Sequence, residues 1–194
     1  MAERKISTRF AVEGEDQYKK SVADINSRLK TLKSELALVQ SQYAGQENSM
    51  EALTAKGQTL AAMYATQQEK VEAARAALQN ASTMQQKYSE EVAKSQQNLA
   101  NAQQELAALS ESTSVSAEEQ KKLQQNVEDC QKALEDAEKR QRASEQSIQK
   151  WQQSMNYAQI ELNRLGTEIN NNNVALESAQ QAAAAPSASM GEGA

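Results

Sequence analysis

The spacing of apolar side chains changes character near residue 14 of this chain. Before that point Ile6, Thr8, Phe10 and Val12 occupy every second position. This period of two is typical of a half-buried strand. After Gly14 the apolar residues recur at alternating intervals of three and four, which is the spacing of an amphipathic helix. We therefore expect a strand-like segment over residues 1–15, followed by a helix.

The helical spacing forms heptads that keep one phase from Tyr18 to Leu109. Such heptads place apolar side chains on one stripe of the helix, the seam through which coiled-coil helices pack. The pattern predicts one long heptad helix over residues 16–110. At 1.5 Å per residue, a helix of that length would extend about 140 Å.

The heptads stop in a serine-rich stretch and resume beyond it. Residues 111–116 are expected to form a reversal loop, and Ser116 and Glu119 have the spacing of a capping box that opens a helix. A second heptad helix is predicted over residues 117–178. The alanine-rich and then Pro/Ser/Gly-rich residues 179–194 predict a flexible tail or linker.

The two predicted helices can pack as antiparallel arms of one hairpin. A reversal near Thr113 pairs residues whose numbers add to about 229. This register places the polar Asn172 opposite the small Gly57. The predicted fold is all-α, a coiled-coil hairpin with a short strand-like N-terminal segment. Its expected core residues are Leu78, Leu99, Leu106, Leu123, Cys130, Ile148, Trp151 and Leu162.

The first predicted helix is longer than the second, so residues 16–52 are expected to lack an internal partner. Their seam is the most aliphatic part of the chain, and an exposed aliphatic stripe favours association. We therefore expect a homo-oligomer through residues 16–52. Its seam residues are Val22, Ile25, Leu29, Leu32, Leu36 and Val39.

Composition narrows the function classes. The 194 residues contain 4% aromatic side chains, no histidine and one cysteine, so an enzyme with a large globular core, a disulfide framework or a Cys/His metal cluster is not expected. The 21 basic and 26 acidic residues are interspersed, which is not the pattern of nucleic-acid readout. No apolar run is long enough to suggest a membrane span. We therefore name no catalytic residue, no cofactor and no metal ligand.

Short sequence segments carry a resemblance to a known family. They are KISTRFAVEG at 5–14, YKK at 18–20 and a helix with Ile25, Asn26, Leu29, Leu32, Ser34 and Glu35. Further similar segments are SMEALTAKGQTLAAM at 49–63, QQEKVEAARAAL at 67–78 and KWQQSMNYAQIELNRLGTEINNNN at 150–173. In this order they resemble the N-terminal region of tape measure proteins of bacteriophage tails, of the type found in Gram-positive phages and prophages.

The resemblance implies a structural protein of the virion. A tape measure protein is an internal rod of the tail tube that sets tail length during assembly and is expelled at DNA ejection. Tail tube proteins and a tail assembly chaperone are the implied partners. The implied location is the tail tube lumen, after synthesis in the bacterial host cytoplasm.

Two other functions stay open on the residues alone. One is a cytoplasmic coiled-coil scaffold or interaction protein without a virion role. The other is a helical arm of an enzyme, against which the acidic charge balance speaks where the arm would bind RNA.

Overall fold

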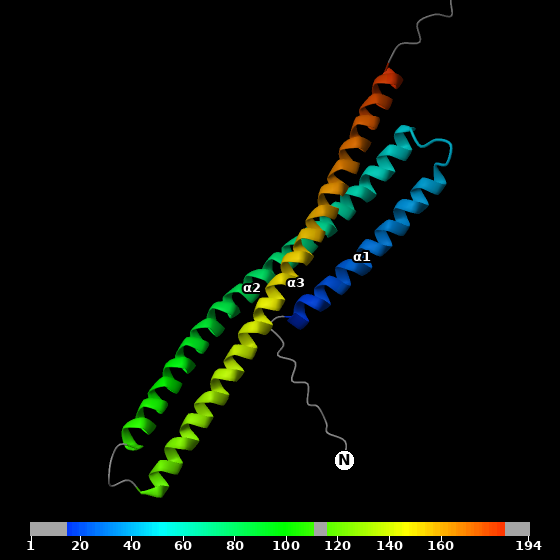
Figure 1. Cartoon of the computed structure of the whole chain (residues 1–194). Coiled ribbons are helices and arrows are strands. Elements are labelled where there is room, and N and C mark those ends of the chain that lie inside the picture. Colours follow the sequence, from blue (N-terminus) through cyan, green and yellow to red (C-terminus); the bar gives the residue numbers. More distant parts are fainter. Residues whose placement is uncertain (1–14, 111–115, 185–194) are drawn as a thin grey trace, which may run out of the picture. The chain divides into compact units, whose positions relative to one another are not determined.

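The computed structural model describes residues 15–110 and 116–184, and its elements are helices. They are α1 (Glu15–Gln42), α2 (Met50–Ser110) and α3 (Ala117–Ala184), shown in Figure 1. No strand occurs within these two ranges, and the fold is all-α. The strand-like segment expected over residues 1–15 lies outside the described residues, apart from Glu15, which begins α1.

The described chain divides into two compact units. The two-helix unit contains the part of α2 from Ala76 onward and the part of α3 up to Gln152. The three-helix unit contains α1 from Gln17, α2 up to Arg75 and α3 from Gln153. Two long helices therefore contribute to both units, whereas α1 packs within the three-helix unit.

The expected single helix over residues 16–110 is wrong, because the chain leaves the helical conformation between α1 and α2. Gly45 has a φ of 83°, a left-handed value that glycine adopts without strain. Its N–H donates to the Glu47 carboxylate at 2.8 Å. The Ser49 hydroxyl accepts the Ala52 N–H at 3.2 Å, which is an N-cap for α2. A glycine followed four residues later by a capping serine is the signal that the heptad pattern concealed.

The heptad phase continues across this interruption because it reports which side of a helix faces a core, and not whether one helix continues. Ile25 on α1 and Leu53 on α2 occupy seam positions and are buried. Gln46 and Met50, the two seam positions at the interruption, are exposed. Periodicity therefore identified the buried side of each helix but missed the turn between them.

The beginning of α3 confirms the expected capping box, and its end corrects the expected tail. The Ser116 hydroxyl accepts the Glu119 N–H at 3.2 Å, and the Glu119 carboxylate accepts the Ser116 N–H at 3.2 Å. The helix extends to Ala184 instead of residue 178. Alanine and glutamine favour the helical conformation over residues 179–184. Residues 111–115 of the expected loop and 185–194 of the expected tail lie outside the described residues.

The three-helix unit has a core of large aliphatic side chains. Leu60 is fully buried and packs with Met63 and Leu165. Partly buried Leu32 and Leu36 of α1 pack against this cluster. A neighbouring cluster contains Val71, Ala158 and Leu162. All three helices thus contribute to this unit's core.

The two-helix unit is packed mainly through small side chains, with Val92 and Trp151 as its larger buried residues. Ala81, Ala102 and Ala137 are buried, and Ser144 is fully buried. The Ser144 hydroxyl donates to the carbonyl oxygen of Ala81 on the facing helix at 3.2 Å. A side chain of two heavy atoms reaches that backbone only when two helices approach closely. The narrow side chains therefore set a short separation between α2 and α3 in this unit.

Candidate functional site

The aliphatic stripe of α1 is occupied within the chain. Ile25 and Leu29 are buried, while Leu32 and Leu36 pack on the core of Leu60, Met63 and Leu165. Val22 and Val39 are half-buried. The premise that residues 16–52 lack an internal partner is therefore wrong. The turn after α1 lets the helix fold back, so its stripe faces α2 and α3 of the same unit.

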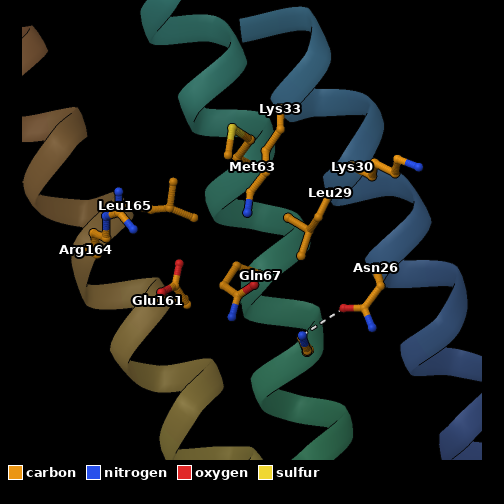
Figure 2. Close-up of a pocket in the computed structure, with 10 residues that line it drawn as sticks. Asn26, Leu29, Lys30, Lys33, Met63, Gln67, Glu161, Arg164 and Leu165 are labelled. Carbon is orange, nitrogen blue, oxygen red and sulfur yellow. Dashed lines mark hydrogen bonds between the residues drawn. The ribbon is translucent and has the colours of Figure 1, made fainter. Parts of the chain in front are cut away.

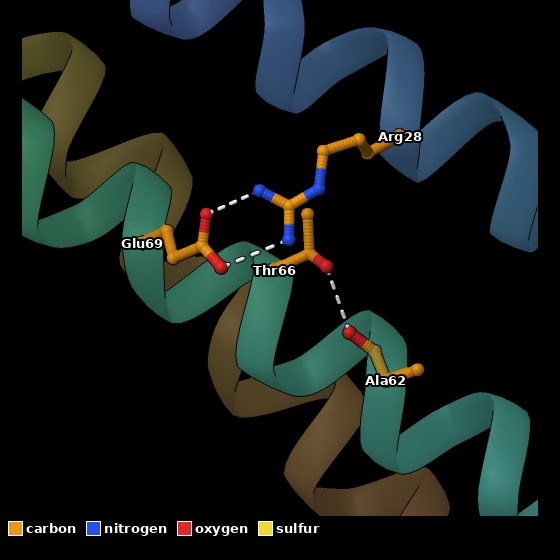
Figure 3. Close-up of polar contacts among 4 residues, drawn as sticks. All are labelled: Arg28, Ala62, Thr66 and Glu69. Atoms are coloured by element: carbon orange, nitrogen blue, oxygen red, sulfur yellow. Dashed lines mark hydrogen bonds and ion pairs between the residues drawn. The ribbon is translucent and has the colours of Figure 1, made fainter.

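Polar contacts fix α1 on the unit as well. The Arg28 guanidinium makes two hydrogen bonds to the Glu69 carboxylate of α2, one of them at 2.9 Å (Figure 3). The hydrogen bond from Arg28 lowers the pKa of Glu69. The Tyr18 hydroxyl lies 2.7 Å from the Ser154 hydroxyl of α3. These contacts connect one side of α1 to both of its neighbours.

Figure 3 also shows a hydrogen bond within α2, next to the contact with Arg28. Thr66, one turn before Glu69, is buried and donates its hydroxyl to the carbonyl oxygen of Ala62 at 2.9 Å. A β-branched hydroxyl satisfied on its own helix can be buried without a partner on a second helix. Thr66 therefore needs no polar partner on another helix, and Glu69 is the residue that pairs with Arg28 of α1.

The residues expected to form the core between the two long helices are all at least half-buried. Trp151 and Leu162 are buried. The remaining six are half-buried, namely Leu78, Leu99, Leu106, Leu123, Cys130 and Ile148. The Cys130 thiol donates to the Asn126 amide oxygen on the same helix at 3.9 Å.

Three polar seam residues join facing helices through the same kind of bond. The Gln67 amide donates to the Ala158 carbonyl at 2.8 Å, and the Asn172 amide donates to the Leu53 carbonyl at 2.9 Å. Ser144 bonds to Ala81 in the same way. The nitrogen of the Asn172 amide lies 3.0 Å from where a Cβ on Gly57 would be, as expected from the sequence. Each of these three side chains thus donates to one carbonyl of the facing helix, while the buried amide oxygen of Asn172 has no hydrogen-bond partner within the described residues.

A hollow of about 460 Å³ lies among the three helices of the three-helix unit (Figure 2). Its floor includes Leu29, Met63 and Leu165. The charged residues that line it are Lys30, Lys33, Lys70, Arg164 and Glu161. Four cations against one carboxylate is a local reversal of the chain's formal charge of −5. Because the heptad pattern did not predict that α1 folds back on α2 and α3, these lysines could not be grouped from the sequence alone.

Exposed apolar side chains also occur away from the seams. Tyr157 and Ile160 lie three residues apart on α3 and are 71% and 59% exposed. Spacing of three places them on one face of the helix. Within residues 15–110 and 116–184, no group of three or more His, Cys, Asp or Glu side chains is placed to hold a metal ion, and no helix there is long and apolar enough to cross a membrane.

Comparison with protein-family models, with curated proteins and with solved structures found no match to this chain.

Proposed function

We propose that the chain is a structural protein of a phage tail, an internal tape measure rod whose helical length contributes to setting tail length during tube assembly. The observation that carries the proposal is the continuity of α2 and α3, which have 61 and 68 residues. A continuous helix rises about 1.5 Å per residue, so α3 has a contour length of about 100 Å. The number of residues in such a helix therefore determines its length.

We propose further that α2 and α3 pack as antiparallel arms of a coiled-coil hairpin. The contacts of Gln141 with Ser89 and of Arg140 with Glu91 support this arrangement in the two-helix unit, with N to O distances of 3.1 Å and 2.8 Å. The proposed register pairs Leu123 with Leu106 next to the reversal. Farther along α3, Arg140 and Gln141 contact residues that come earlier in α2, as antiparallel helices require. The heptad seams, buried or half-buried throughout α3, supply the apolar part of the pairing.

A rod of this kind suits passage through a tube because most apolar side chains of its seams are buried or half-buried within the chain. The outer positions of α3 carry alternating charges, such as Glu135, Asp136 and Lys139, which pair along the helix surface. Exposed pairs of this kind contribute little stability but keep the surface hydrated. The proposed partners are tail tube proteins and a tail assembly chaperone. The proposed location of the chain is the lumen of the tail tube.

The proposal does not require the homo-oligomer through residues 16–52. Val22, Ile25, Leu29, Leu32, Leu36 and Val39 face the three-helix unit, so association through them would require α1 to leave that unit. Any contact between copies is more simply placed on surfaces that the chain leaves exposed.

The experiment that tests the role is the production of particles from a phage or prophage that encodes the chain, with and without its gene. We expect mass spectrometry of purified tails to detect the protein, and loss of the gene to leave tubes that are absent or irregular in length. Normal tails that lack the protein would contradict the proposal and favour the cytoplasmic scaffold.

A further inference from the structure

The hollow of the three-helix unit combines an apolar floor with an uncompensated positive charge. Figure 2 shows Lys33 reaching from α1 toward the hollow, whereas Lys30 points away from it. Lys70 of α2 donates to the Asn26 amide oxygen at 2.8 Å. A neutral amide oxygen satisfies one hydrogen of the ammonium group without cancelling its charge.

Within the described residues, the arginines of the same unit are ion-paired, whereas the lysines that line the hollow are not. Arg28 pairs with Glu69, and Arg164 at the edge of the hollow lies 3.4 Å from the Glu168 carboxylate. Within the described residues, neither Lys33 nor Lys70 makes an ion pair. The carboxylate that lines the same hollow is that of Glu161, which faces it from α3 (Figure 2).

The electrostatics of Lys70 agree with this geometry. Burial lowers its pKa, the nearby Lys33 charge lowers it further, and Glu161 partly opposes both effects. An anion placed between the two lysines would relieve the repulsion that Lys33 exerts on Lys70.

We propose that this hollow is a binding site for a small multivalent phosphate, held by the ammonium groups of Lys33 and Lys70. Its volume is within the range of about 300 to 1,000 Å³ that small ligands occupy. Lysine binds phosphate as a point charge, whereas arginine forms bidentate hydrogen bonds with phosphate and carboxylate alike. Glu161 repels the ligand and limits affinity. This inference is independent of the proposed tail function.

The test is calorimetric titration of the full chain with inorganic tripolyphosphate at low ionic strength, where screening is weakest. We expect Lys33→Gln combined with Lys70→Gln to weaken binding about tenfold or more, since two charge-assisted contacts are lost. The matched control is Lys87→Gln with Lys94→Gln, two exposed lysines of the two-helix unit, which removes the same charge and should leave affinity within about twofold.

A second variant is expected to change the affinity in the opposite direction. Glu161→Gln removes the carboxylate from the hollow at an exposed position and should strengthen tripolyphosphate binding, a gain that damage to the fold would not produce. Circular dichroism verifies that each variant keeps its helices.

ATP and citrate distinguish the sources of the anion. If tripolyphosphate and ATP bind with equal affinity, the site recognises the phosphate chain of either molecule. If tripolyphosphate binds more tightly than ATP, the site recognises free polyphosphate. The proposal is overturned by absence of tripolyphosphate binding, by equal losses in the control pair, by no gain in Glu161→Gln, or by citrate binding as tightly.

Discussion

At the scale of single residues, Gln67, Ser144 and Asn172 act as alignment marks. Each is buried in an apolar seam and donates to one carbonyl of the facing helix. A shift of the helices would leave these groups buried without partners, which costs about 1 to 3 kcal/mol each. The polar residues thus favour one register, whereas the leucines would tolerate several.

Gly57 and Asn172 are expected to be energetically coupled. In Gly57→Ala the new Cβ would lie 3.0 Å from the Asn172 amide nitrogen and displace it from the Leu53 carbonyl. The gain in helix propensity of about 1 kcal/mol should then be cancelled by loss of that hydrogen bond. In an Asn172→Ala background the same change should stabilise by about 1 kcal/mol. Urea unfolding of the four proteins measures the coupling, and additive effects would refute it.

The Arg28 and Glu69 pair predicts a pH dependence of the three-helix unit. Arg28 holds the pKa of Glu69 below its ordinary value in the folded chain. A carboxyl whose pKa is lower when folded stabilises the fold above its unfolded pKa, and this contribution disappears as pH falls through the folded pKa. Glu69→Gln should therefore lower Tm more at about pH 6 than at about pH 3. A Tm difference that is equal at both pH values would contradict the ion pair.

At the scale of helices, α1 is an element held on the unit by one apolar face. Leu29→Asp with Leu36→Asp would bury two charges and should cost several kcal/mol, enough to release α1. Hydrogen exchange should become fast over residues 15–42 and stay slow over residues 76–110 and 117–152. Leu38→Asp is the matched control, because Leu38 lies on the same helix and is 58% exposed. Equal loss of protection in the control would show that α1 is not held by this face.

The antiparallel arrangement of the two long helices can be tested with the native thiol. Leu99 and Cys130 are both half-buried, and the proposed register pairs them, so Leu99→Cys should form an intramolecular disulfide with Cys130. Leu106→Cys is the control, since it lies two turns away, about 10 Å along the helix. Non-reducing mass spectrometry distinguishes the products. Bridges only between chains would refute the hairpin.

How much of this could be read from the sequence depends on which property a pattern reports. Heptads reported the buried side, and the positions of Leu60, Val71 and Leu162 agree with them. The Ser116 capping box was readable because its hydrogen bonds are local. The hollow was not, because Lys33 and Lys70 come together only once the chain turns at Gly45.

At the scale of the whole molecule, two packing regimes divide the same pair of helices. The three-helix unit is built on leucine and methionine, whereas alanine and serine predominate among the buried side chains of the two-helix unit, beside the larger Val92 and Trp151. Large aliphatic side chains bury more apolar surface per residue and give greater stability. The two-helix unit therefore depends more on repeated close contact between the backbones of α2 and α3. Heptads deleted from this unit should shorten the helices while leaving the same kind of packing.

The measurement that tests the central claim most directly is tail length, by electron microscopy, in particles that carry a shortened rod. Deleting residues 88–101 together with 128–141 removes two heptads from each arm, keeps the seam phase and leaves the contacts of α1 in place. A variant of unchanged length, Glu91→Gln with Arg140→Gln, serves as the control. We expect the deletion to shorten tails by about 21 Å if the hairpin persists, or about twice that if the helices extend. Tails of unchanged length that contain the shortened protein would contradict the account.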